Sequence, residues 1–242
     1  MIQVTYLDHS GFTVELHDAV LVFDYYRDPS HALHKLLEHH PDKAVVFFVS
    51  HNHTDHYNPG IFEIAQNHRR VYVVSNDVPA QNIPTTAEVA GMSAGDVIDR
   101  LPGDITVKAY GSTDKGVSFL VTLPDGHKIF HAGDLNDWHW QDESTVREAQ
   151  KADADFDKIL YRIKEENPEV YVAMYPVDSR QGSDYARGAR KFLQAVKVAN
   201  FFPMHFNGRY EEACDFASYA PEGTSTQFHC LHKPGSTTDL PC

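Results

Sequence analysis

Ser50-His51-Asn52-His53-Thr54-Asp55-His56 follows directly after the apolar run 44–49. The apolar run predicts a buried strand. Asn58-Pro59 predicts the start of a helix, with asparagine as the N-cap and proline at the first helical position. Three histidines and one carboxylate therefore stand where a strand ends and a helix begins. At such a position a metal site is favoured over a histidine-rich surface loop.

The spacing of these side chains predicts two sets of ligands. Alternate residues of an extended segment point the same way, so His51 and His53 converge on one ion. The turn that follows directs Asp55 and His56 toward a second point nearby. Two ligand pairs offset in this way suit two metal ions about 3.5–4 Å apart. Zn²⁺ is the expected metal, with Mn²⁺ and Fe²⁺ as alternatives.

Length and composition indicate one soluble α/β domain. The chain has 242 residues, of which 42% are hydrophobic and 23% charged, as is usual for globular proteins. No linker or repeat divides it, so residues 1–242 are interpreted as a single domain. No apolar run reaches membrane-spanning length, and the first residues resemble a strand rather than a secretory signal. We therefore expect a cytoplasmic protein without a membrane partner, and a homo-oligomer is left open.

Charge and cysteine content narrow the partners and the compartment. The net charge of −13, from 21 Lys+Arg and 34 Asp+Glu, repels phosphate backbones, so nucleic acid is disfavoured as a substrate. A small molecule is favoured instead. Cys214, Cys230 and Cys242 show no C-x-x-C spacing. This odd, sparse set fits a reducing compartment better than a disulfide framework.

Apolar runs and helical patterns alternate along the chain, which predicts an α/β fold. Helices are expected from residues 28–29 to near 41, and over 61–65, 144–165 and 184–198. Residues 76–95, rich in Pro, Gly, Ala and Thr, predict a loop. Strands are expected at 2–7, 12–16, 20–23, 44–49, 71–74, 105–110, 117–123, 128–131, 170–174, 201–204 and 226–232.

A site for two metal ions needs more than four protein ligands, and two later strand ends can supply them. His131 stands at the end of one strand and is expected to complete a three-histidine set for the first ion. Asp134, three residues on, is expected to bridge both ions. His205 ends another apolar strand and is expected to complete the second ion. The expected ligands are His51, His53, Asp55, His56, His131, Asp134 and His205.

With these segments the chain resembles the metallo-β-lactamase superfamily over nearly its whole length. The resemblance rests on the opening 6–12, on Asp24 at a strand end, on the histidine segment and on the later ligands. It implies an αββα four-layer sandwich, in which helices flank two sheets and the metals lie at one sheet edge. It also implies that Asp24 orients a ligand imidazole. Without the resemblance, an ordinary turn residue is an equally good interpretation of Asp24.

The opening and the short tail are most similar to the ascorbate-6-phosphate-lactonase-like branch of that superfamily. Residues 231–235 resemble the final strand of this branch. Asp8 stands where that branch usually has a glycine before His9. This difference can change the local turn and therefore how far His9 reaches toward the site. His9 is expected, like Asp24, to support the ligands rather than to be one of them.

The resemblance and the ligand set together predict a binuclear metal-dependent hydrolase. Two cations that share a water lower its pKa toward neutrality. The resulting hydroxide is expected to attack a small-molecule ester, lactone or phosphoester. Asp55 and Asp134 are the candidate catalytic residues, with Asp134 holding the metal pair and accepting a proton from the nucleophile.

Candidates for substrate contact follow the ligands in the chain. Trp138, His139 and Trp140 could wall a pocket, and core packing is the equal alternative. Arg180 could contact a phosphate-bearing substrate. A basic helix face at i, i+3 and i+4 could do the same, although a solvated face that balances acidic residues is the favoured interpretation. This face consists of Arg187, Arg190 and Lys191.

Four alternatives to a small-ester hydrolase remain. A thioester hydrolase would share the ligand set but is expected to carry a C-terminal helical domain. A phosphodiesterase or nuclease is expected to need a basic arm. A di-iron oxidoreductase resembles this motif with a carboxylate at the position of His53, and with a flavin domain. A non-catalytic metal-dependent binding protein would bind its ligand without forming a product.

Overall fold

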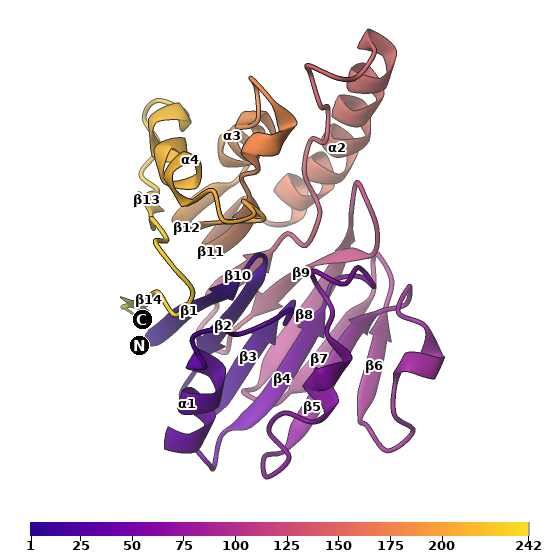
Figure 1. Cartoon of the computed structure of the whole chain (residues 1–242), viewed down its shortest axis with the longest axis vertical. Coiled ribbons are helices and arrows are strands. Elements are labelled where there is room, and N and C mark those ends of the chain that lie inside the picture. Colours follow the sequence, from indigo (N-terminus) through magenta and orange to yellow (C-terminus); the bar gives the residue numbers. More distant parts are fainter. Residues whose placement is uncertain (242) are drawn as a thin grey trace.

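Runs of β-branched and aromatic residues form two seven-stranded sheets in the computed structural model, which describes residues 1–241 (Figure 1). The first sheet contains β1 (Ile2–Asp8), β2 (Gly11–Glu15), β3 (Ala19–Phe23), β4 (Ala44–Val49), β5 (Arg70–Ser75), β6 (Val89–Met92) and β14 (Thr237–Leu240), in the order β14-β1-β2-β3-β4-β5-β6. The second contains β7 (Val97–Leu101), β8 (Ile105–Gly111), β9 (Val117–Thr122), β10 (Lys128–His131), β11 (Glu169–Pro176), β12 (Lys197–Met204) and β13 (Gln227–Phe228), in the order β13-β12-β11-β10-β9-β8-β7.

Helices cover the outer faces of both sheets (Figure 1). Leu33 and Leu37 of α1 pack with the buried residues of β3 and β4 on the first sheet. Phe192 of α3 stacks on Phe130 of the second sheet, with ring centroids 5.2 Å apart. The layers are therefore helix, sheet, sheet, helix, which confirms the predicted αββα sandwich. The helices are α1 (Ala32–His39), α2 (Val146–Glu166), α3 (Arg187–Ala195) and α4 (Tyr210–Asp215), with short 3₁₀ turns η1 (Pro59–Phe62), η2 (Ala80–Asn82), η3 (Ser179–Gln181) and η4 (Phe216–Tyr219).

Aromatic side chains fill the space between the two sheets. Phe23 and Phe48 of the first sheet stack with centroids 4.6 Å apart, and Phe48 meets Phe119 of the second sheet edge to face at 5.3 Å. All three side chains are buried. Burial of such a side chain contributes roughly 1.5–3 kcal/mol. The core therefore fixes the two sheets against each other and sets the position of the strand ends.

Parallel strands bring the functional segments to one edge of the sandwich. β3, β4 and β5 run parallel in the first sheet, and β10, β11 and β12 run parallel in the second. The carboxyl ends of neighbouring parallel strands lie at the same edge, where ligand sites of α/β proteins form. The segments after β3, β4, β10 and β12 carry Asp24, the histidine segment, Asp134 and His205.

Several predicted elements differ from the structure. Residues 76–95 were expected to form a loop, but they include the strand β6 and the turn η2. The strands β7 and β14 were not predicted at all. The helix expected over 61–65 is the short turn η1, where Asn58 caps Gly60 N at 2.8 Å. Residues 231–235 form no strand, and the final strand is β14. β6 and β7 lie at sheet edges and are partly exposed, so their apolar pattern is weak.

Two cysteines pair, contrary to the expectation of free thiols. Cys214 of α4 forms a disulfide with Cys230, and their Cα atoms lie 4.8 Å apart. The chain folds back through η4 and β13 between these positions, which brings the two residues together. Cys242 lies outside the described residues. Within residues 1–241, no helix has the length and apolar content needed to cross a membrane.

Candidate metal centre

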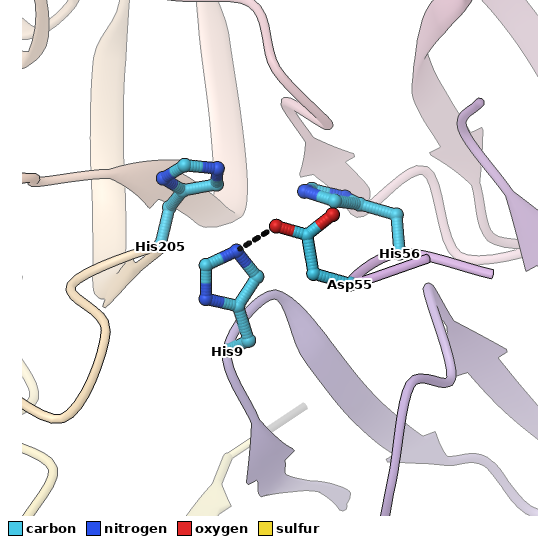
Figure 2. Close-up of side chains that lie close together, drawn as sticks. All are labelled: His9, Asp55, His56 and His205. Atoms are coloured by element: carbon cyan, nitrogen blue, oxygen red, sulfur yellow. Dashed lines mark ion pairs between the residues drawn. The ribbon is translucent and has the colours of Figure 1, made fainter. Parts of the chain in front are cut away.

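Eight His and Asp side chains gather at the sheet edge in two groups that could each hold a metal ion. Within each group the ligand atoms lie within 4.8 Å of one another. The members come from loops that are far apart in the sequence, and Figure 2 shows how those of the second group converge. Group one is His51, His53, Asp114 and Asp134, and group two is His9, Asp55, His56 and His205.

Asp134 links the two groups. Its Oδ2 lies 3.3 Å from Nε2 of His51 in group one. Its Oδ1 lies 3.1 Å from Nε2 of His56 and 3.3 Å from Nε2 of His205, both in group two. One carboxylate oxygen therefore faces each group, as in a ligand that bridges two cations.

The backbone holds several of these residues in unusual conformations. His9, Asp24 and His205 have φ angles of 53°, 41° and 63°, in the left-handed region that non-glycine residues rarely adopt. His205 N donates to the carbonyl of His9 at 3.1 Å, so the two loops support each other. Gly133 also has a positive φ, and a Cβ there would lie 2.8 Å from Cβ of Ser50. Such strain is typical of sites where the surrounding structure fixes functional groups.

Asp24 orients one imidazole from beneath the site. Its buried carboxylate accepts hydrogen bonds from Ser50 N at 2.7 Å and from Ser50 Oγ at 2.6 Å. Oδ2 also lies 2.8 Å from Nδ1 of His56. With Nδ1 occupied, Nε2 of His56 is directed toward Asp134 and group two. The structure thus places Asp24 where an orienting residue was expected.

Asp178 serves His205 in the same way, although no sequence pattern singled it out. Its buried Oδ2 accepts a hydrogen bond from His205 Nδ1 at 2.9 Å and also binds Arg180. Burial alone would raise the pKa of Asp178, but His205 and Arg180 lower it to about 2. The only sequence signal was an aspartate two residues after an apolar strand.

Atoms in both groups lack the hydrogen bonds that buried polar groups normally make. Nε2 of His9, His51 and His56, and Oδ1 of Asp134, are buried and form no hydrogen bond within residues 1–241. All four belong to the two groups. Imidazole and carboxylate donors suit Zn²⁺, and also Mn²⁺ and Fe²⁺. The residues present therefore fit divalent cations.

Electrostatics keep the carboxylates of the centre charged. The nearby imidazole of His9 lowers the pKa of Asp55. Burial would raise the pKa of Asp134, yet the nearby His56 and His51 hold it well below its usual range. Burial would likewise lower the pKa of His56, but Asp134 and Asp24 raise it to about 10. Asp55 and Asp134 thus bring negative charge to the groups where cations are expected to bind.

His131 does not join either group, which corrects the predicted three-histidine set. Its buried ring stacks on Phe23, with centroids 5.1 Å apart. Nε2 donates to the carbonyl of Ser10 at 2.8 Å, and Nδ1 accepts from Gly133 N at 3.2 Å. Both ring nitrogens are occupied by the backbone, so His131 supports the loops around the site instead.

Asp114 stands in group one where His131 was expected. It lies in the loop between β8 and β9, and its Oδ2 is 3.6 Å from Nδ1 of His53. Its side chain is 46% exposed. The sequence signal was weak, because one aspartate in the segment Gly111-Ser112-Thr113-Asp114-Lys115 resembles an ordinary loop residue.

His9 reaches further into the site than an orienting role requires. Asp8 Oδ1 accepts a hydrogen bond from His9 N at 2.8 Å, and Asp8 Oδ2 lies 2.5 Å from Arg27 Nε. The turn thus formed directs the imidazole of His9 to Asp55, with Nε2 3.4 Å from Oδ2. His9 is therefore a member of group two (Figure 2).

The predicted pocket residues divide between the site and the interior. The ring of Trp138 lies 5.2 Å from that of His205, and Trp138 Nε1 donates to the Asp134 carbonyl at 2.8 Å. Trp140 stacks on Trp138 at 6.4 Å. His139 is fully buried and donates to a backbone carbonyl through Nδ1, so it does not belong to an open pocket wall.

The predicted basic side chains lie in two places, one beside the candidate metal centre and the other on α3. Arg180 lines a cavity beside group two. Arg187 and Lys191 instead bind Asp153 of α2, at 2.8 Å and 2.7 Å. Arg190 is exposed on α3. The helix face thus balances acidic residues, as the favoured interpretation held.

Comparisons with known proteins agree with this fold. The sequence model of the beta-lactamase superfamily domain matches residues 3–154. No curated protein sequence matches the chain. The metallo hydrolase Igni18 from Ignicoccus hospitalis has a similar structure, with a TM-score of 0.70 and 17% identity over 99% of both chains.

Two further solved structures share the fold. The isothiocyanate hydrolase from Delia radicum gut bacteria has a TM-score of 0.59 and 12% identity, over 98% of this chain and 99% of that one. CmlA, a diiron β-hydroxylase from Streptomyces venezuelae, has a TM-score of 0.65 and 13% identity, over 99% of this chain and 54% of its own. Since the domain model spans more than half of the chain and the sandwich carries two His/Asp groups at its edge, the protein belongs to the β-lactamase superfamily.

Proposed function

We propose that the protein is a hydrolase that depends on two divalent cations, one at each group. Asp134 carries this proposal, because its two oxygens face the two groups at 3.1–3.3 Å. Zn²⁺ is the expected metal, and Mn²⁺ or Fe²⁺ are the alternatives. Bound cations of this kind supply an activated water near neutral pH and polarise the bond to be cleaved.

The residues of the chain position the candidate ligands. Asp24 and Asp178 fix the imidazoles of His56 and His205. The ring of Trp138 packs beside that of His205, with centroids 5.2 Å apart. Asp55 is 47% exposed and lines the cavity, so its carboxylate is accessible to a bound substrate.

The proposed substrate is a small ester, lactone or phosphoester. The cavity beside group two measures about 600 Å³, a size that suits a small molecule. The resemblance to the ascorbate-6-phosphate-lactonase-like branch supports a lactone. The net charge of −13 opposes a nucleic acid substrate.

A substrate panel with measured metal content tests the proposal. Metal-reconstituted protein should hydrolyse at least one of a set of lactones, aryl esters, thioesters and phosphodiesters. Asp134→Asn should lose bound metal and lower kcat/KM at least about 100-fold, because both groups lose a shared ligand. Arg190→Gln changes an exposed side chain of α3 and is the matched control. It should retain the bound metal and the wild-type kcat/KM. Full turnover by Asp134→Asn would refute the proposal, and tight ligand binding without product would indicate a binding protein.

A further inference from the structure

The cavity beside group two is lined by two arginines and two aspartates together with polar and aromatic side chains. His9 and Asp55 form part of its lining, so a bound molecule contacts the candidate ligands directly. Arg27 and Arg180 line the same cavity, although the chain has only 21 Lys+Arg against 34 Asp+Glu. The remaining lining residues are Asp8, Tyr26, Pro29, Asn207, Gly208, Tyr210 and Pro234.

Arg27 is held at the mouth of this cavity with hydrogen-bond donors to spare. Its Nε binds Asp8 Oδ2 at 2.5 Å, and its guanidinium lies over the ring of Tyr26 at 4.9 Å. These two contacts fix a side chain that is 60% exposed. Its Nη1 and Nη2 groups make no hydrogen bond within residues 1–241. A guanidinium edge of this kind matches the two oxygens of a carboxylate, sulfonate or phosphate.

Arg180 provides a second fixed guanidinium, closer to the candidate ligands. Asp178 binds its Nε and Nη2, at 2.8 Å and 2.5 Å, while Nη1 makes no hydrogen bond within the described part of the chain. Its Nη2 lies 3.4 Å from Nδ1 of His205, a member of group two. Arg180 therefore lies beside the candidate ligands, whereas Arg27 lies on the Asp8 side of the cavity.

We propose that this cavity selects substrates that carry an anionic group apart from the bond to be cleaved. Arg27 binds this group at the mouth, and the scissile bond then lies over His9 and Asp55. Arg180, on the inner side, favours the charge that develops next to the metal groups. The substrate class rests on the proposed hydrolase function, whereas anion binding by Arg27 does not.

A binding experiment tests the anion site without turnover. The probes are 2-acetamidoethanesulfonate, whose sulfonate is a poor metal ligand, and the neutral N-propylacetamide, both titrated into metal-loaded protein by NMR. The sulfonate should bind at least about tenfold more tightly, since a charge-assisted hydrogen bond contributes this much. Arg27→Gln should remove this preference, and Arg190→Gln should keep it. Equal affinities, or a preference that survives in Arg27→Gln, would overturn the inference.

A matched pair of esters separates this inference from the proposed function. Mono-4-nitrophenyl glutarate and 4-nitrophenyl valerate differ only in a terminal carboxylate against a methyl group. The ratio of their kcat/KM values should favour the glutarate about tenfold and should fall to near one in Arg27→Gln, mainly through KM. Sulfonate binding that Arg27→Gln abolishes, without hydrolysis of either ester or of any compound in the substrate panel, would refute the hydrolase alone. Hydrolysis of both esters at equal rates in wild type would refute the anion preference alone.

Discussion

Asp114 and Asp134 differ in how many of the two candidate groups they join. Asp134 contributes one oxygen to each group, whereas Asp114 contributes to group one alone. His131 is close in sequence to Asp134, but its two ring nitrogens bind Ser10 O and Gly133 N. The number of bound metal ions should therefore depend on the exposed Asp114 and not on the buried His131.

Two single variants separate these roles. Asp114→Asn should lower the metal content from two ions to about one per chain, because group one loses a charged ligand. His131→Gln retains a donor for the Ser10 carbonyl and should keep two ions. Plasma emission spectrometry of dialysed protein gives the content, and circular dichroism confirms that each variant folds. A loss of metal in His131→Gln together with full loading of Asp114→Asn would restore the three-histidine set.

Sequence patterns predicted those site residues that adjoin strong strands. The histidine segment, Asp134 and His205 follow the predicted strands 44–49, 128–131 and 201–204, so their place at a sheet edge could be inferred. Asp114, in the loop between β8 and β9, and Asp178, although it comes two residues after β11, carry no pattern that distinguishes them from turn residues. Their roles depend on the path of the β8–β9 loop and on the reach of η3 toward His205, and both depend on tertiary packing.

At the scale of elements, a polar network joins the end of α2 to β8. Glu166 Oε2 accepts hydrogen bonds from Lys108 Nζ at 2.5 Å and from Tyr110 OH at 2.6 Å. Lys108 first, and then Tyr110, lower the pKa of Glu166. The helix begins at a capping box formed by Thr145 and Glu148. Both ends of α2 are therefore fixed by specific polar contacts.

The pKa of Glu166 gives a pH-dependent prediction for stability. Because the carboxylate is favoured in the folded state, its contribution is present above the unfolded pKa of about 4.3 and is lost as pH falls through the lowered folded pKa. Glu166→Gln should therefore cost about 0.5 kcal/mol at pH 7, a value discounted for the partial exposure of the pair. This difference should shrink below pH 4.

Urea denaturation at pH 7 and at pH 3.5 measures this effect. Glu165→Gln is the matched control, because Glu165 is exposed and makes no hydrogen bond or ion pair within residues 1–241. The control should match wild type at both pH values. A Glu166→Gln deficit that is equal or larger at pH 3.5 would show that the carboxylate charge is not what stabilises the contact.

Elements with a deep apolar face were predicted well, and edge elements were not. The parallel strands β4 and β11 are almost wholly buried, and their apolar runs were evident in the sequence. β7 has a single buried residue, Leu101, and β13 is only two residues long. Edge strands owe their pairing to a neighbour rather than to their own pattern.

At the scale of the whole molecule, the candidate centre joins the two sheets. His9, Asp55 and the three histidines of the 51–56 segment come from the first sheet, and Asp114, Asp134 and His205 from the second. Val117 N also donates to the Ser50 carbonyl at 2.9 Å beside the site. Cations bound by both sheets should therefore hold the sandwich closed at this edge.

Metal removal should consequently lower global stability. A ligand that binds only the folded state stabilises it by about 2.7 kcal/mol at a hundred times its Kd. Chelation should lower the Tm, and addition of Zn²⁺ should restore it. Asp134→Asn should show little change with either treatment. Differential scanning calorimetry measures these shifts, and identical Tm values with and without chelator in wild type would contradict a structural contribution of the metal.

The most direct measurement is anomalous X-ray diffraction from crystals of metal-loaded protein, recorded on both sides of the zinc absorption edge. Two anomalous peaks should lie about 3.5–4 Å apart, with Asp134 contacting both and Asp114 contacting the one beside His51 and His53. A single peak, no peak, or a peak coordinated by His131 would contradict the two-group centre.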